Sequence, residues 1–222
     1  MGILRVAQMG HPVLRMVSRA LSADEIRTPA FQNFCDDLFE TMDDYDGLGL
    51  AAPQVHVPIR VVIATLSEER GPEFFVNPVI TPTGTTTTTT WEGCLSVEGM
   101  RARVTRPDHV TVEALDRDGT PKRYELDGHP AVVIQHECDH LDGVLYLDRA
   151  DLKTLAFLRE YRRFGSMLVG ETDDEEGEED EEGVAEPIGA PPLHTGELGD
   201  FDDDVYGELT AEELRFDRGG VG

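Results

Sequence analysis

The stretch Gln135-His136-Glu137-Cys138-Asp139-His140 sets the framework for the rest of the chain. It contains the pattern H-E-x-x-H. If the segment is helical, His136 and His140 lie four residues apart on one face and can bind one metal ion. Glu137 would then stand beside the open side of the ion and could carry protons. The same pattern also fits two polar histidines on a partly exposed helix, so a metal site requires support from elsewhere in the chain.

The residues around this stretch predict a helix from His129-Pro130 to about Asp142-Gly143. Proline is favoured in the first turn of a helix and glycine just after its end. Val132 and Val133 precede His136 by four and three residues. They are therefore expected on the histidine face, where they could form an apolar pocket beside an ion.

The three cysteines of the chain occupy different settings. Cys35 falls in the apolar stripe of a helix predicted over residues 29–45, and Cys138 falls on the far side of the motif helix, so both are expected in the core. Cys94 lies between a glycine and Leu95, outside any apolar stripe. A catalytic site needs three protein ligands and an open position, so Cys94 is the best candidate for the third ligand. One thiolate and two imidazoles suit iron(II) or zinc.

Residues 47–54, GLGLAAPQ, carry almost no side-chain bulk. Small residues let a backbone approach a ligand or another backbone closely. Gln54 is the only hydrogen-bonding side chain of the segment, and it follows a rigid proline. The alternative interpretation is a plain tight turn between a helix and a strand.

The remaining patterns predict mostly strands. We expect them over residues 59–66, 74–80, 104–115 and 122–126, with an edge strand in the threonine run 85–90. The last two predicted strands pair as a hairpin across an Asp-Gly turn. Apolar residues at 152, 155, 158 and 161 predict a final helix that carries several cations. The fold class is therefore α+β: mostly antiparallel sheets packed around a central C-terminal metal-binding helix, with an N-terminal helix and a disordered acidic tail.

The charge is distributed unevenly between two parts of the chain. Residues 171–222 hold 20 Asp and Glu against two Arg, so −18 of the net charge of −26 lies there. Such a segment is solvated and self-repelling, and we predict a catalytic domain over 1–170 and a disordered tail over 171–222. The few cysteines are odd in number, which fits a reducing compartment. The sequence has no apolar leader and no run of 18 apolar residues, so we predict a cytoplasmic protein.

Three segments together resemble the defining motifs of the peptide deformylases: GLGLAAPQ at 47–54, EGCLS at 92–96 and QHECDH at 135–140. HPVLR at 11–15, the Asn77-Pro78 pair and HLDGVLYLDR at 140–149 resemble flanking segments of that family. The resemblance covers about residues 3–165. It implies an enzyme that removes the formyl group from the N-terminal formylmethionine of new polypeptides and releases formate.

The resemblance also implies a role for each matching residue. It assigns one divalent ion, with iron(II) favoured and zinc possible, to Cys94, His136 and His140. It assigns proton transfer to Glu137, and stabilisation of the oxyanion to the Gln54 amide and the Leu95 backbone N–H. From helical spacing and motif position, the substrate's methionine pocket is expected at Leu48, Gly49, Leu95, Val132 and Val133. Arg101 resembles a family arginine near the substrate backbone, although it could be an ordinary surface arginine. Asp139 either orients a ligand histidine or pairs with Arg106.

The expected partners are nascent formylated polypeptides and, transiently, the bacterial ribosome, with no membrane and no specific DNA. We expect a monomer. Two alternatives remain: a zinc peptidase, which would need a His or Glu as third ligand, and a domain that only binds nascent chains. For the acidic tail there are two interpretations. It competes with ribosomal RNA for the cationic last helix, or it only keeps the protein soluble.

Overall fold

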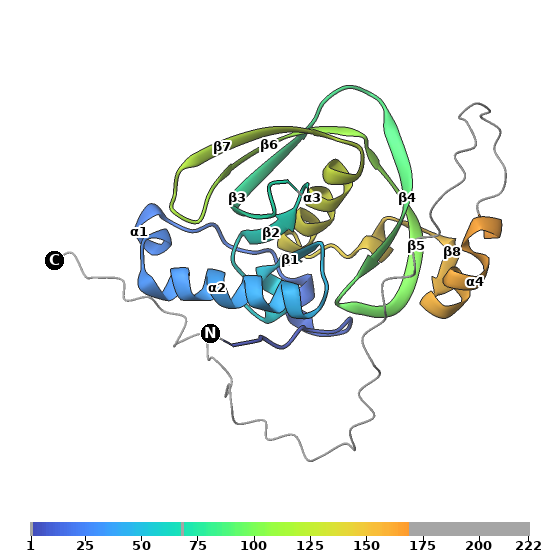
Figure 1. The fold of residues 1–222 in the computed structure, drawn as a ribbon, viewed down its shortest axis with the longest axis horizontal. Coiled ribbons are helices and arrows are strands. Elements are labelled where there is room, and N and C mark those ends of the chain that lie inside the picture. Colours follow the sequence, from blue (N-terminus) through green and yellow to red (C-terminus); the bar gives the residue numbers. More distant parts are fainter. Residues whose placement is uncertain (1, 68, 169–222) are drawn as a thin grey trace, which may run out of the picture. The chain divides into compact units, whose positions relative to one another are not determined.

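The computed structural model describes residues 2–67 and 69–168, which form two antiparallel sheets around one buried helix (Figure 1). The helices are α1 (Ala23–Ile26), α2 (Pro29–Asp44), α3 (Gly128–Leu141) and α4 (Leu158–Leu168). Three short 3-10 turns are η1 (Pro12–Arg15), η2 (Ala52–Val55) and η3 (Tyr146–Asp148). This arrangement confirms the predicted α+β class.

The strands divide into a five-stranded and a three-stranded sheet. The larger has the order β1 (Gly49–Ala51), β2 (Val61–Thr65), β3 (Pro72–Pro82), β6 (His109–Leu115) and β7 (Pro121–Asp127). The smaller has the order β4 (Thr87–Cys94), β5 (Val97–Pro107) and β8 (Ala150–Phe157). β4 carries most of the threonine run and pairs only with β5 among the described strands, which confirms the predicted edge position.

Helix α3 lies at the centre of the fold (Figure 1), and residues 131–141 are all buried. A helix that is covered on every side must find a partner for each polar side chain or place it at a functional site. The apolar side chains of α3 pack on the five-stranded sheet, so its polar side chains are the ones that need partners or a functional role. Ile134 of α3, for example, belongs to one core cluster with Val62 of β2 and Val112 of β6.

Helix α2 confirms the prediction over residues 29–45. Thr28 caps it, because the Thr28 side chain accepts a hydrogen bond from the Phe31 backbone N–H, and Pro29 occupies the first turn. Its apolar stripe packs into a second core cluster with residues of β2, among them Val61. Cys35 is fully buried in that cluster, as predicted.

Two sequence-based boundaries are wrong. Residues 104–115 form two strands rather than one, because β5 ends at Pro107 and β6 begins at His109 in the other sheet. The final helix was predicted to include residues 152–157, but these form β8, which pairs with β5. Backbone pairing with β5 outweighs the helical spacing of Leu152 and Leu155.

The predicted acidic tail, 171–222, lies outside the described residues. Within 2–67 and 69–168, helices are either too short or too polar to span a lipid bilayer.

Candidate active site

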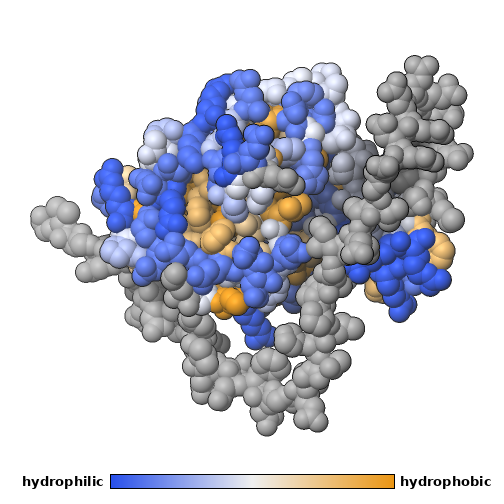
Figure 2. Space-filling model, viewed as in Figure 1, coloured by the Kyte–Doolittle hydropathy of each residue, from blue (hydrophilic) through white to orange (hydrophobic). Residues whose placement is uncertain are grey.

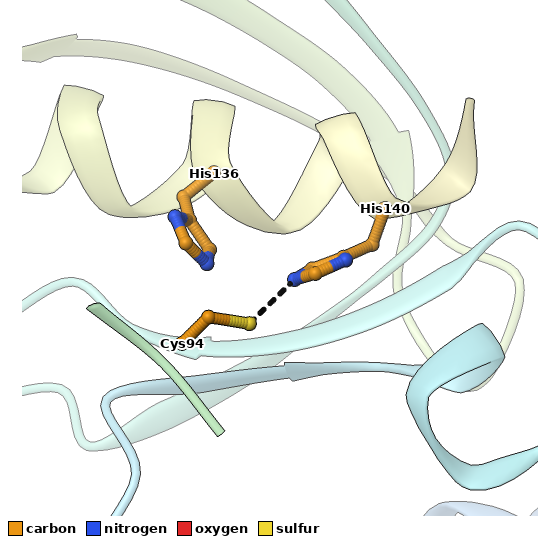
Figure 3. A group of neighbouring side chains, drawn as sticks. All are labelled: Cys94, His136 and His140. Carbon is orange, nitrogen blue, oxygen red and sulfur yellow. Dashed lines mark hydrogen bonds between the residues drawn. The ribbon is translucent and has the colours of Figure 1, made fainter. Parts of the chain in front are cut away.

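Three potential metal ligands come together between the smaller sheet and the central helix. Cys94 ends β4, and His136 and His140 project toward it from α3 (Figure 3). One ligand atom of each residue lies within 4.8 Å of the others, and Cys94 Sγ is 3.2 Å from His140 Nε2. All three side chains are buried. The structure thus brings together the three residues that the sequence indicated.

An irregularity in strand pairing lies directly before Cys94. The pairing of β4 with β5 shifts between Glu92 and Cys94, while Glu92 and Cys94 are both buried, as the two-residue alternation of a strand requires. Gly93 lies in the shifted segment, where an added Cβ would be 1.9 Å from Nη1 of Arg101. A glycine is therefore required for the Arg101 guanidinium to lie across the strand at this point.

Glu92 fixes the orientation of His136. Its Oε2 is 2.8 Å from His136 Nδ1, which leaves Nε2 of that ring available for a metal ion. Arg106 donates to both oxygens of Glu92, at 2.6 and 2.9 Å, and to Asp139 at 2.8 Å. Burial works against the carboxylate charge, but hydrogen bonds from His136 and Arg106 lower the pKa of Glu92 to about 2. The ligand histidine is thus held by a buried anion that is itself paired.

The donor set fits a divalent transition metal. Three protein ligands with a sulfur and two imidazole nitrogens leave one position open, as catalytic sites require. Burial alone would raise the pKa of the Cys94 thiol, but charge on His140 and hydrogen bonds with both histidines hold that pKa well below its usual value. A thiol that ionises readily is suited to bind a metal ion. The third potential ligand is the cysteine that the sequence indicated. A zinc peptidase would need a His or Glu at this position.

Glu137 is a buried carboxylate next to the ligand cluster. Its Oε2 has no hydrogen-bond partner among the described residues. Burial raises the pKa of Glu137 to about 7, while the neighbouring histidines pull it downward. Gly49 of β1 makes room for it, since an added Cβ there would lie 2.6 Å from Glu137 Oε1. A carboxyl that titrates near neutrality can both accept and donate a proton.

The Gln54 amide is oriented toward Cys94. Its Oε1 accepts a hydrogen bond from the Ala51 N–H at 2.8 Å, so the amide nitrogen must face the other way. That nitrogen donates to Ser96 Oγ at 3.2 Å and lies 3.5 Å from Cys94 Sγ. Leu95, the residue after Cys94, begins the turn into β5.

The proposed substrate residues occupy different environments. Leu48 is 54% exposed, whereas Val132 is buried one turn before His136. Val133 packs in the apolar core with residues of the five-stranded sheet, so its side chain contributes to helix packing. Arg101 donates to the Met100 carbonyl at 2.9 Å. Figure 2 shows apolar surface near the centre of this face of the molecule, ringed by hydrophilic residues.

Sequence reasoning missed several residues that support the ligands. It gave no role to Glu92 or Ser96, although both lie within two residues of Cys94 and proximity to a ligand was a usable signal. Asp139 pairs with Arg106, one of the two options expected, and also binds Arg149 through two bonds of 2.7 Å. Cys138 is buried and belongs to the apolar core, as predicted.

A buried Cys-His-His cluster beside an unpaired glutamate defines a metal-dependent hydrolase. The family model described as polypeptide deformylase matches residues 3–155. The chain is 40% identical to the peptide deformylase of Leptospira biflexa over 158 residues, which cover 67% of this chain and 88% of the relative. It is 45% identical over 150 residues to peptide deformylase 2 of Xanthomonas campestris, covering 67% and 87%.

Solved structures give the same result. The actinonin-bound class I type b peptide deformylase of Acinetobacter baumannii superposes with a TM-score of 0.64 at 33% identity, covering 68% of this chain and all of that one. The chain belongs to the peptide deformylase family, whose members remove the N-formyl group from nascent polypeptides. The resemblance expected from the three motifs is thereby confirmed.

Proposed function

We propose that deformylation in this chain depends on a single constellation: Glu137 for proton transfer, and Gln54 and Leu95 for the oxyanion, around an ion held by Cys94, His136 and His140. The observation that carries the proposal is the unpartnered, buried Glu137 carboxylate directly beside three convergent ligand atoms. A divalent ion bound there supplies a Lewis acid and lowers the pKa of water to about 7.

The chain's own residues perform the proton transfers. Glu137 accepts the proton of the attacking water, since burial raises its pKa to about 7 and a carboxyl with such a pKa can exchange a proton near neutral pH. The water oxygen bonds to the formyl carbon, and the carbonyl oxygen gains charge. Glu137 then gives the proton to the amine nitrogen as the carbon–nitrogen bond breaks, which yields formate and a free N-terminus.

Two donors are proposed to stabilise the developing oxyanion. The Gln54 amide nitrogen already faces Cys94, held by the bond from the Ala51 N–H to Oε1. The Leu95 backbone N–H follows Cys94 directly in the chain. Donors placed before the reaction cost no reorganisation as charge develops, and losing one typically slows catalysis about 100- to 1,000-fold.

For the substrate, we propose that Leu48, Gly49, Val132 and Val133 bound the methionine pocket and that Arg101 contacts the peptide backbone. Leu48 is exposed and precedes β1, and Val132 is buried on α3 one turn before His136. Val133 would act by fixing the helix, because its side chain packs in the core.

We also propose iron(II) as the native ion, a monomeric catalytic domain over 1–170, a cytoplasmic location and transient contact with the ribosome. All three thiols are free, which suits a reducing compartment. Anaerobic purification followed by metal analysis distinguishes iron from zinc. Light scattering of the purified protein measures its mass in solution.

The test of the catalytic proposal is formate release from formyl-Met-Ala-Ser by the full chain loaded with iron under anaerobic conditions. Glu137→Gln should retain the ion but lower kcat at least about 100-fold, because it removes proton transfer. Glu113→Gln, which alters an exposed carboxylate paired with Arg123, is the matched control and should keep wild-type activity. A fully metallated Glu137→Gln variant with wild-type kcat would refute the role of Glu137.

A further inference from the structure

The turn that contains Leu95 is not held by its own backbone preference. Leu95 and Ser96 form the two-residue link between β4 and β5, since Cys94 pairs with Val97 across it. Two-residue hairpin links favour turns in which the first or both central residues have positive φ. Neither Leu95 nor Ser96 does so. Contacts from outside the hairpin must therefore stabilise this turn.

Besides the bond from Gln54 to the Ser96 hydroxyl, such contacts come from residues 7–9, which we name the N-terminal strap. The Gln8 side-chain amide donates to the Leu95 carbonyl at 3.1 Å, and the Met9 backbone N–H donates to the Ser96 carbonyl at 2.7 Å. Both carbonyls of the turn are thus bound by consecutive residues of the strap. The Gln8 side chain that binds the Leu95 carbonyl is exposed.

The same strap also reaches the second proposed oxyanion donor. The Ala7 backbone N–H donates to the Gln54 carbonyl at 2.7 Å. Just beyond the strap, His11 packs edge-on against His56, with ring centroids 4.6 Å apart. His11 is itself fixed, because its Nδ1 accepts a hydrogen bond from the Val13 N–H. The chain around the strap therefore contacts the Gln54 segment on both sides, through Ala7 and through His11, and the Leu95 turn in between.

We infer that Gln8 is a positioning residue for the reaction: by binding the Leu95 carbonyl it fixes the turn and so directs the Leu95 N–H toward the oxyanion. The inference rests on the role proposed for Leu95. Gln8 touches neither the ligand cluster nor Glu137, so its loss should leave metal binding and proton transfer intact. The loss changes the direction of the Leu95 backbone N–H, and small errors in the position of a catalytic group slow the reaction strongly.

The kinetic test compares variants of the full, iron-loaded chain on formyl-Met-Ala-Ser. Gln8→Leu and Gln8→Glu remove the amide donor and should lower kcat about 3- to 10-fold, with KM and metal content within twofold of wild type. Gln8→Lys retains a donor of similar reach and should recover most of the rate. Met9→Ala is the matched control, because it keeps the backbone N–H that binds Ser96 and should behave as wild type.

Hydrogen exchange provides a second measurement that needs no turnover. Backbone amides of residues 94–97 should exchange severalfold faster in Gln8→Leu and Gln8→Glu, but not in Met9→Ala or Gln8→Lys. Unchanged exchange in both donor-less variants overturns the inference, and so does faster exchange with unchanged kcat. Absence of formate release by the wild type would instead refute the proposed function, while exchange would still decide whether Gln8 fixes the turn.

Discussion

Glu92 is the residue that connects the ligand cluster to the buried charges behind it. It accepts from His136 and from Arg106, and both Glu92 and Arg106 are almost fully buried. We predict that Glu92→Gln weakens metal binding about 10- to 100-fold, because carboxylates behind a ligand histidine fix its ring and raise its basicity. Competition with a chelator of known affinity measures the effect directly.

The same substitution should also lower stability, since the Arg106 charge would lose a buried partner. Glu113→Gln again serves as control, because Glu113 and Arg123 are both 61% exposed and such pairs contribute little. If Glu92→Gln binds metal as tightly as wild type, Glu92 does not control the His136 ring.

Residue-scale prediction succeeded where a spacing or a local setting was decisive. The four-residue spacing of His136 and His140 predicted a shared face, and the setting of Cys94 set it apart from the two core cysteines. Glu92 was not assigned a role, although it lies two residues before Cys94 and both are buried, so strand alternation places them on one face of β4. The alternation does not show that this face meets α3, because the contact joins Glu92 to His136, 44 positions along the chain. The contact of Gln8 with Leu95 joins residues 87 positions apart and leaves no local pattern.

At the scale of elements, Asn77 determines how β3 continues past its break. It has φ of +51°, its side chain accepts from the Leu21 N–H at 2.9 Å, and it donates to the Leu21 carbonyl at 2.8 Å. We predict that Asn77→Ala lowers the free energy of unfolding by about 2–4 kcal/mol, because it removes both bonds and leaves a β-carbon at positive φ. Thermal unfolding measures this as a lower Tm.

Asn77→Gly separates the two causes. Glycine adopts positive φ without penalty but cannot bind Leu21, so its Tm should lie between those of Asn77→Ala and the wild type. Equal Tm values for the alanine and glycine variants would show that the backbone conformation contributes nothing.

Helices and strands were predictable where a local sequence pattern decided the structure and no tertiary pairing worked against it. The capped stripe of α2 and the Asp-Gly hairpin of β6 and β7 needed no partner to be recognised. β8 was mistaken for helix because leucines at 152 and 155 satisfy helical spacing, while the strand depends on backbone pairing with β5. β5 and β6 were merged because Pro107 and Asp108 interrupt an alternating run only briefly, and the change of sheet at that point is a tertiary event.

At the scale of the whole molecule, the apolar residues of β8 and α4 lie beside cations. Leu155, Phe157 and Phe164 are partly or largely exposed, and Arg159 lies over the Phe157 ring. Figure 2 shows apolar surface next to hydrophilic surface at the α4 end of the molecule. Mixed apolar and cationic surface suits a partner with anionic groups, such as the ribosome proposed above.

The acidic segment 171–222 follows α4 after two residues and brings a net charge of −18. If it competes with ribosomal RNA for the cations of α4, removing it should strengthen ribosome binding. We predict that a chain ending at Gly170 binds ribosomes about tenfold more tightly than the full chain at low salt, and that the difference shrinks as ionic strength rises. Co-sedimentation at several salt concentrations measures both effects.

The matched control places Arg162→Gln in both chain lengths. Arg162 is exposed on α4 and has no ion pair among the described residues. If its charge contributes to the contact and the acidic segment competes for it, the substitution should weaken binding of the shortened chain more than that of the full chain. Equal affinity of the full and shortened chains at every salt concentration would reject competition, and the segment would then act only through solubility, which aggregation assays at high protein concentration would detect.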